Sequence, residues 1–275
     1  MAWQELSTNI IQFVGTIALA YTCYWLLWHI LFYLLPNLSL DRWRHHQQKS
    51  WALVAGSSAG ISLGAAQELA IKGFNVVLLG HLRDELAEAR SLILAESPRT
   101  EVEIVVLDAT SASSKETEQA LRPLSSLPLT VLVNNVGGFP IKPPQIRNLV
   151  DYTGEELDRS LNINAHFLSQ VTRILLPQIC IVPYSGCKGI IVSFSKALSK
   201  EMRAARLLVD VLAIVPGNLQ SRSHVVGLMP GTPTARAYAK IVLDRAPRAV
   251  SWGRVEVIPF WPHAVQILFV ESLSR

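Results

Sequence analysis

The stretch WALVAGSSAGIS, residues 51–62, decides the fold of this 275-residue chain. Its first five residues form an uninterrupted apolar run, which is typical of a short strand buried on both faces. A turn with Gly56 and Gly60 follows, and an amphipathic stretch then extends to Ile71. Glycines between a strand and a helix let the backbone approach a pyrophosphate, whose charge is stabilised by the N–H groups at the helix start. The position of the turn after the first strand therefore favours a nucleotide-binding site.

The same alternation of apolar runs and amphipathic segments continues toward the C-terminus. Thr153-Gly-Glu-Glu156 has the pattern of a capping box and predicts a helix that extends toward Pro177. Thr232-Pro233 predicts the start of a later helix. We therefore expect an α/β fold with a Rossmann-type, doubly wound parallel sheet that is covered by helices. Further strands are expected at residues 74–80, 102–108, 130–135, 209–216 and 254–260.

A long apolar segment precedes this domain. Residues 10–35 contain no Asp, Glu, Lys or Arg. As a helix with a rise of 1.5 Å per residue, the segment is about 39 Å long, which is enough to cross a hydrocarbon layer of ~30 Å. The alternative is a cleaved signal peptide, which needs basic residues in front and a shorter apolar core, whereas only Glu5 is charged there. We expect an uncleaved transmembrane anchor.

Basic residues follow the apolar segment, and none precedes it. Arg42, Arg44 and Lys49 come after the span, so the positive-inside rule leaves the C-terminal body in the cytosol. The chain is accordingly divided into a short lumenal end, an anchor, a basic linker, a domain and an apolar tail. These five parts are residues 1–9, 10–35, 36–50, 51–260 and 261–275.

Composition and charge exclude two classes of protein. Half of the residues are apolar and 17% are charged, with a mean hydropathy of +0.29, which excludes a disordered chain. The formal net charge is +4, but residues 51–234 hold 16 basic and 16 acidic side chains. A nucleic-acid-binding protein concentrates positive charge on its folded body. We therefore expect no nucleic-acid partner.

Four more motifs follow the glycine turn in order. Asp108 ends the third expected strand, and Asn134-Asn135-Val136-Gly137 ends the fourth. Tyr184-Ser-Gly-Cys-Lys188 and then Pro216-Gly217 come later. Over residues 51–221, this order resembles the short-chain dehydrogenase/reductase family.

The glycine turn departs from the family pattern at one position. The family turn reads Gly-x-x-x-Gly-x-Gly, and its third glycine is Ser62 here. That position is small because strand and helix pack closely there. Ser62 is itself small, and Gly64 also keeps the helix start slim.

The resemblance implies the catalytic groups Tyr184, Lys188 and Asn164. Tyr184 would be the acid/base, and Lys188, four residues on, would share its helix face, lower its pKa from about 10 and bind the ribose. A surface Tyr–Lys pair is the alternative. An asparagine in the long preceding helix would hold a bend and a proton-relay water. Asn164 fits that role best, with Asn162 as the second choice.

The segment after the second strand indicates the cofactor. An NAD-dependent enzyme usually has an acid there to bind the ribose 2′-hydroxyl. Here His81 and Arg83 precede the first acid, Asp84, so we expect NADP(H), although Arg83 as a solvated helix residue is the alternative. Asp108 would contact the adenine. The residues expected to bind the cofactor are Gly56, Ser58, Gly60, Ile61, His81, Arg83, Asp108, Asn135, Tyr184, Lys188, Pro216 and Gly217.

One element of the family is missing. Relatives have a strand that ends in a substrate-binding serine about a dozen residues before the tyrosine. Counting back from Tyr184 reaches Thr172, which lies inside the expected helix. We therefore expect the fifth strand to be absent or replaced. Roughly twenty residues, which include this strand and its serine, are missing relative to the family. Unpaired N–H and C=O groups would then be buried in the sheet, unless the strand at 209–216 shifts to pair with that at 130–135.

The substrate is implied by Val136 together with the anchor. Both resemble a branch of membrane-bound very-long-chain 3-oxoacyl-CoA reductases and 17β-hydroxysteroid dehydrogenases. The branch implies reduction of a lipid-like ketone to an alcohol by NADPH at the endoplasmic reticulum membrane. A catalytically inactive NADP-binding or scaffold relative is the alternative.

Two C-terminal segments have open interpretations. Residues 221–232 could be a lid over the substrate or a plain loop. Residues 257–270, VIPFWPHAVQILFV, are too short to span a bilayer. They could lie in the membrane interface, or be buried against the domain or the partner subunit of a homodimer.

Overall fold

The computed structural model describes residues 2–138, 140, 151–177, 181–185, 190–217, 219–220 and 232–273. For residues 2–8, 10, 181–185, 190–191 and 268–273 only the backbone is described. The chain divides into two compact units, Met1–Asn37 and Leu38–Arg275.

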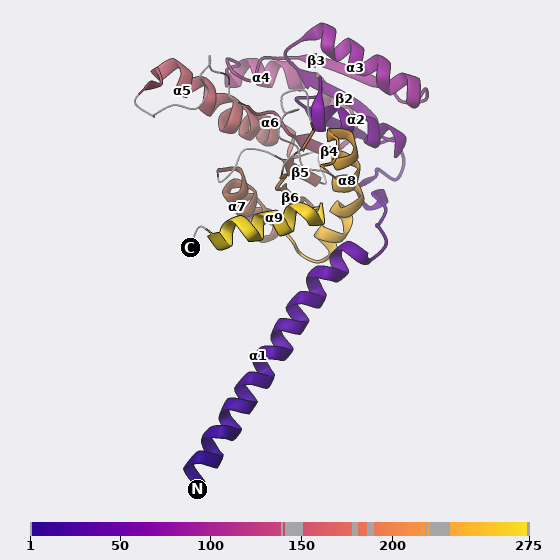
Figure 1. Ribbon diagram of the computed structural model, residues 1–275. Coiled ribbons are helices and arrows are strands. Elements are labelled where there is room, and N and C mark those ends of the chain that lie inside the picture. The colour runs from indigo at the N-terminus through magenta and orange to yellow at the C-terminus, as the bar shows by residue number, and fades with distance from the viewer. Residues whose placement is uncertain are drawn as a thin grey trace. The chain divides into compact units, whose positions relative to one another are not determined.

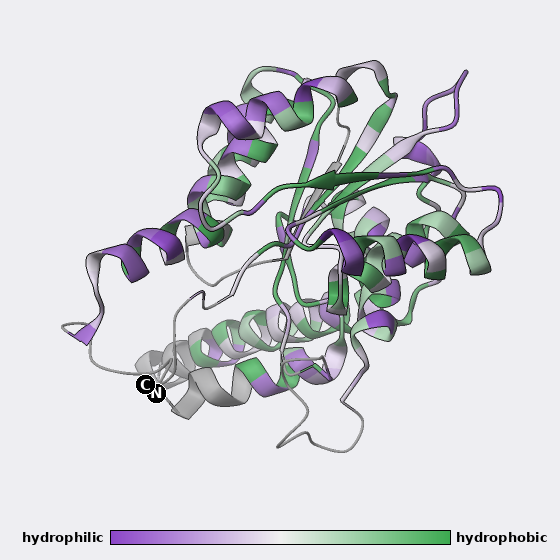
Figure 2. Cartoon of the chain, turned by 90° about the horizontal axis from the view of Figure 1, so that it is seen from above, coloured by the Kyte–Doolittle hydropathy of each residue, from purple (hydrophilic) through white to green (hydrophobic). Residues whose placement is uncertain are grey.

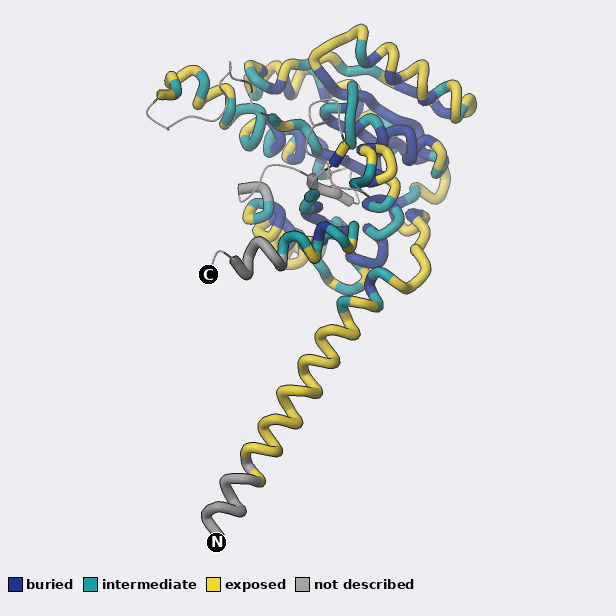
Figure 3. Tube along the Cα trace, in the orientation of Figure 1, coloured by how far each residue is buried: buried dark blue, intermediate teal, exposed yellow. Residues whose placement is uncertain are grey.

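The first unit is a single helix, α1 (Ala2–Leu34). Its stretch Ile11–Leu34 has a mean hydropathy of 1.5 and side chains that are almost all exposed (Figure 3). The hydroxyl groups of Thr16 and Thr22 donate to the backbone oxygens of Gln12 and Ala18, each at 2.8 Å. These two hydroxyl groups are satisfied within the helix, and α1 has the length and composition that a membrane-spanning helix needs.

The second unit is built on a seven-stranded sheet in which every recorded strand pair is parallel. The strand order is β3-β2-β1-β4-β5-β6-β7 (Figure 1). Successive strands are added on one side of β1 up to β3 and on its other side from β4 onward, so the strand order reverses between β1 and β4. This order confirms the predicted doubly wound sheet, whose ligands bind at the carboxyl ends of the strands. The strands are β1 (Trp51–Ala55), β2 (Asn75–Gly80), β3 (Val102–Val106), β4 (Leu129–Asn134), β5 (Ile181–Ser185), β6 (Asp210–Ile214) and β7 (Glu256–Val257).

Helices cover the sheet, and two of them begin within two residues of the predicted starts. The Thr153 hydroxyl accepts from the Glu156 N–H, which completes the expected capping box, and Thr234 caps the later helix two residues after Thr232. The helices are α2 (Gly60–Ile71), α3 (Arg83–Glu96), α4 (Ser114–Leu121), α5 (Gly154–Leu161), α6 (Phe167–Leu175), α7 (Ile190–Ala204), α8 (Ala235–Ser251) and α9 (Trp261–Leu273). Short helical segments are η1 (Asp41–Trp43), η2 (Arg122–Ser126) and the π-helical η4 (Asn162–His166).

Alternate residues of the central strands pack on opposite faces of the sheet. Leu53 and Leu132 join one buried cluster with Phe167, Leu168 and other residues of α4 and α6. On the other face, Val133 and Ile214 line a small apolar space with residues of α2 and α8. The strands are accordingly mostly hydrophobic, while the outer faces of the helices are more hydrophilic (Figure 2). This pattern explains why the sequence shows uninterrupted apolar runs.

The fifth position of the sheet is filled by a segment that we did not predict there. Residues 181–185 form β5 between β4 and β6, so the fifth strand is replaced, and the alternative in which the strand at 209–216 shifts onto the fourth strand does not occur. A gap would leave ladder groups unpaired in the core, and the nearest chain fills it. β5 carries Pro183, which has no N–H to donate and is unusual in an interior strand. The two recorded pairs with β4, Val131 with Ile181 and Asn134 with Tyr184, lie on either side of this proline.

The segment expected as a basic linker packs against the domain. Trp43 is buried, and its indole Nε1–H donates to Asp210 at 3.0 Å. Arg44 donates to the backbone oxygens of Lys72 and Gly73 and stacks over Phe74 with 4.5 Å to the ring centroid. These contacts make the segment from Leu38 a part of the folded unit.

Asp244 on α8 joins two helices through ion pairs. Its carboxylate contacts Lys72 and, at 2.6 Å, Lys240. Burial raises the pKa of Asp244, but the hydrogen bonds from Lys240 and Lys72 outweigh this effect and hold the pKa below its ordinary value. The ion pairs therefore stabilise the fold above about pH 4, and this stabilisation is lost as the pH falls through the folded-state pKa.

Replacement of Asp244 by Asn is expected to lower the free energy of unfolding by about 1 kcal/mol at pH 7. The difference from the wild type should be smaller at pH 3, because the stabilisation is lost as the pH falls through the folded-state pKa of the aspartate. Denaturant unfolding of the full chain in detergent at both pH values measures this. An equal loss at pH 7 and pH 3 would contradict the ion-pair account.

Candidate functional site

The turn between β1 and α2 has the geometry that was predicted for it. Gly56 and Gly60 have φ angles of +75° and +65°, which favour glycine. A Cβ at Gly56 would lie 3.1 Å from a methyl group of Val136. The residue before α2 is Ala59, whose side chain cannot cap the first N–H groups of the helix. A helix start of this kind, reached by a close backbone, fits the pyrophosphate of a dinucleotide.

The departure at Ser62 has a structural explanation. Ser62 is buried, and its hydroxyl oxygen accepts from Nδ2 of Asn135 at 2.8 Å. The turn is thereby tied to the segment after β4. The closest packing of the helix start is instead at Gly64, where a Cβ would lie 2.6 Å from Cα of Arg236. The small residue that the close packing of the helix start requires is therefore Gly64, as predicted near this position.

Asn134 ties β4 to α6. It is fully buried, and its Nδ2 donates to the backbone oxygen of Leu168 at 2.9 Å and to the Thr172 hydroxyl at 3.1 Å. Its Oδ1 receives no hydrogen bond among the described residues. Thr172 in turn donates to the Leu168 oxygen and is 1% exposed. Thr172 therefore serves the packing of α6 and does not replace the missing serine.

The two candidate asparagines lie in the π-helical segment η4 and hold different loops. Asn164 donates to the backbone oxygen of Gly138 at 2.8 Å and accepts from its N–H at 3.0 Å. Asn162 donates to the backbone oxygen of Ala109 at 3.1 Å, next to Asp108. Single π-helical turns within helices are frequent at functional sites. The long helix is therefore interrupted by a π-helical turn, from which Asn164 bonds to the loop after β4.

The structure places Tyr184 differently from our prediction. Tyr184 lies in β5, where its backbone pairs with Asn134 of β4 and Ala213 of β6. The next helix, α7, begins only at Ile190. The prediction that Tyr184 lies on a helix face with Lys188 is therefore wrong, and Lys188 itself lies outside the described residues. The physical reason is the short connection after α6, because of which residues 181–185 take the place beside β4.

The residues expected around the adenine end lie at the carboxyl edge of the sheet. His81 and Arg83 are exposed between β2 and the first turn of α3. Asp108 is also exposed, and one of its carboxylate oxygens accepts from both the N–H and the hydroxyl of Thr110 at 2.8 Å. These positions follow neighbouring strands, which is where a dinucleotide would lie.

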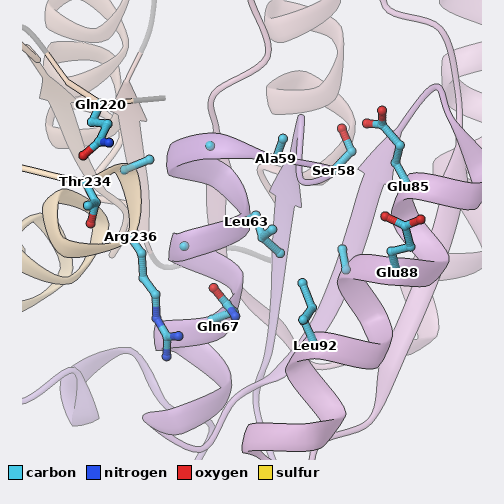
Figure 4. A pocket seen from close by; sticks show the side chains of 14 residues that line it. Ser58, Ala59, Leu63, Gln67, Glu85, Glu88, Leu92, Gln220, Thr234 and Arg236 are labelled. Carbon is cyan, nitrogen blue, oxygen red and sulfur yellow. The ribbon is translucent and has the colours of Figure 1, made fainter. Parts of the chain in front are cut away.

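A cleft of about 490 Å³ runs over α2 from its N-terminal turn. Ser58 and two carboxylates, those of Glu85 and Glu88, lie on one side of α2, whereas Thr234 and Arg236 lie on the other (Figure 4). The sequence analysis did not assign the two glutamates to the site. The signal was their position on the first two turns of the helix that follows the second strand.

The turn Pro216–Gly217 follows β6 at the same edge of the sheet. The Gly217 N–H donates to Nδ1 of His263 at 3.0 Å. His263 belongs to α9, 46 residues further along the chain. No local sequence signal links the two positions, and His263 was therefore not among the predicted site residues.

Comparisons with known proteins agree with this geometry. Residues 50–180 match the family model for short chain dehydrogenase. The very-long-chain 3-oxoacyl-CoA reductase of Pyricularia oryzae is 25% identical over 83% of this chain and 74% of its own length. The enzyme of the same name from Kluyveromyces lactis is 29% identical over 81% of this chain and 71% of its own length.

The fold also matches solved structures. A short-chain dehydrogenase from Sphingobium yanoikuyae, in complex with NADPH, has a TM-score of 0.62 at 19% identity, covering 82% of this chain and 93% of that chain. The family match over residues 50–180, the relatives that align along most of the chain and the shared fold agree with the resemblance to the short-chain dehydrogenase family.

Proposed function

We propose that the chain is an NADPH-dependent oxidoreductase that reduces the ketone of a lipid-like substrate. A 3-oxoacyl-CoA is the preferred candidate substrate, and a steroid is the second candidate. The observation that carries the proposal is the turn from Gly56 to Gly60, which leads into a helix start without a side-chain cap. The name shared by the relatives supports the substrate class. Bound NADPH would supply the hydride that the reaction needs.

The chain's own residues have distinct tasks in this proposal. The glycine turn with Ser58 and Ile61 would hold the pyrophosphate, and Pro216–Gly217 would border the nicotinamide. Asn135, which donates to Ser62, would keep the turn and the segment after β4 in register. Asn164 would fix the loop after β4 through its two bonds to Gly138. Tyr184 would give the proton to the developing alkoxide, with Lys188 beside the ribose.

A second candidate is an NADP(H)-binding relative with little or no turnover. The position of Tyr184 in β5 favours it, because a tyrosine in the sheet does not stand four residues before a lysine on a helix face. The missing serine favours it as well. Loss of one donor to a developing oxyanion costs on the order of 10²–10³ in rate.

The location follows from α1 and the residues after it. We infer a single membrane span with the domain in the cytosol, because Arg42, Arg44 and Lys49 follow the apolar helix. The name of the relatives, which act on very-long-chain acyl substrates, supports the endoplasmic reticulum membrane.

Two measurements on the purified full chain in detergent test the proposal. NADPH binding is followed by cofactor fluorescence, and turnover is followed by NADPH oxidation with 3-oxoacyl-CoA and steroid ketones. Binding together with turnover supports the reductase. Binding without turnover supports the second candidate, and absence of NADPH binding refutes both.

Replacement of Arg83 by Ala is expected to weaken NADPH binding about fivefold and to leave NADH binding unchanged. The reason is that an exposed guanidinium near the 2′-phosphate contributes a modest, salt-dependent attraction. Arg90, exposed on the same helix, provides the control variant Arg90→Ala, which should bind both cofactors as the wild type does. Equal NADPH affinities of the two variants would contradict a role of Arg83 at the phosphate.

A further inference from the structure

His263 contacts the turn that the proposed function places at the nicotinamide. Its side chain is 2% exposed. Because the Gly217 N–H is the donor in the 3.0 Å bond, Nδ1 of His263 must accept. The neutral imidazole therefore carries its proton on Nε2.

Two aromatic rings fix the position of this imidazole. Its centroid lies 5.6 Å from that of Tyr238 on α8 and 4.9 Å from that of Phe260, the latter in an edge-to-face arrangement. The imidazole also packs directly against Gly217, where a Cβ would lie 2.6 Å from Cγ of His263. The ring therefore fills the place of a side chain at position 217, and only glycine fits there.

The segment around the turn is held on both sides as well. The Val215 N–H donates to the Val257 oxygen at 3.0 Å, and the Tyr238 hydroxyl donates to the Val215 oxygen at 3.3 Å. Further along, the Gln220 N–H donates to the Pro233 oxygen at 3.1 Å. Between these anchors, the bond from Gly217 to His263 sets the orientation of the turn itself.

We propose that His263 is a positioning residue for the cofactor: it holds the Pro216–Gly217 turn in the orientation in which the turn borders the nicotinamide. This inference rests on the proposed function, which puts NADP(H) at the carboxyl edge of the sheet. A glycine turn is free to take many orientations, and fixing one of them before binding removes part of the ordering cost. The last helix of the chain thereby contributes to the cofactor site without touching the cofactor.

Two substitutions of His263 separate its hydrogen bond from its packing. In His263→Asn, the amide oxygen can accept from Gly217 near the position of Nδ1, whereas His263→Phe keeps a ring and has no acceptor. We expect NADPH binding to weaken about 3- to 10-fold in the Phe variant. The Asn variant should bind NADPH within about twofold of the wild type. The differences in NADPH affinity should not correlate with differences in the melting temperatures of the two variants.

A measurement on the wild type keeps the test independent of the variants' folding. NMR of the full chain in detergent should detect scalar coupling across the N–H···N bond between Gly217 and His263 without cofactor. Absence of this coupling overturns the proposal. So does NADPH binding by His263→Phe that equals the wild type, or an equal loss in both variants.

The test also distinguishes failure of the underlying function. A wild-type chain that does not bind NADPH refutes the proposed function, whatever the coupling shows. A wild-type chain that binds NADPH, together with a Phe variant that binds equally well, refutes only the role of His263.

Discussion

Insertion of the strand-and-serine segment of a relative between Pro177 and Ile181 is expected to raise ketone reduction by at least about 10²-fold over the chain as it stands. The inserted strand would take the place of β5, so that residues 181–185 no longer have to complete the sheet. The helix that now starts at Ile190 could then begin at Tyr184. Tyr184 would lie four residues before Lys188 on that helix. The inserted serine would supply a second hydrogen-bond donor to the developing alkoxide, worth 10²–10³ in rate by itself.

The rate of NADPH oxidation with a 3-oxoacyl-CoA measures the gain, and two controls assign it. The same insertion with its serine changed to Ala should lose most of the serine's share but keep the restored sheet. The insertion combined with Tyr184→Phe should fall back to the rate of the original chain. Substantial turnover by the original chain, or no gain upon insertion, would show that the shortened segment is not what limits the chemistry.

The position of β5 also shows which parts of the fold are determined by local sequence patterns and which are not. The glycine turn and the capping box at Thr153 depend on residues close to one another in the sequence, so local patterns predicted them. Which segment completes a sheet depends instead on the alternatives available to the whole fold. Residues 181–185 include Pro183, which argues against an interior strand, yet among the described residues this segment lies between β4 and β6.

The candidate site divides in the same way. Local motifs predicted Gly56 and Gly60, whose positive φ angles favour glycine, and Asn164, which bonds to Gly138. His263 and Gly217 are far apart in the sequence, and only the packing of α9 brings them together. A histidine in an apolar C-terminal helix carries no local pattern that indicates a role at a turn 46 residues away in the sequence.

The close approach of α2 and α8 leads to the second large effect, the replacement of Gly64 by Val. A Cβ at this position would lie 2.6 Å from Cα and 3.2 Å from both N and Cβ of Arg236. Since two of these atoms belong to the backbone, a rotamer change cannot relieve the clash, and the helices must separate. We expect a loss of about 3 kcal/mol or more in the free energy of unfolding, at the upper end for overpacked interiors.

Gly154→Val is the matched control for this experiment, because Gly154 is also helical and a Cβ there would have no atom within 4 Å. It should cost less than about 1 kcal/mol, and Gly64→Ala should lie between the two. Denaturant unfolding of the full chain in detergent measures all three variants.

Separation of α2 from α8 would also move the start of α2, where the proposed pyrophosphate site lies. NADPH binding by Gly64→Ala is therefore expected to weaken under conditions where the protein is still folded, whereas Gly154→Val should bind as the wild type does. Equal stabilities of the Gly64 and Gly154 variants would mean that the two helices can separate without cost, contrary to the packing that joins them.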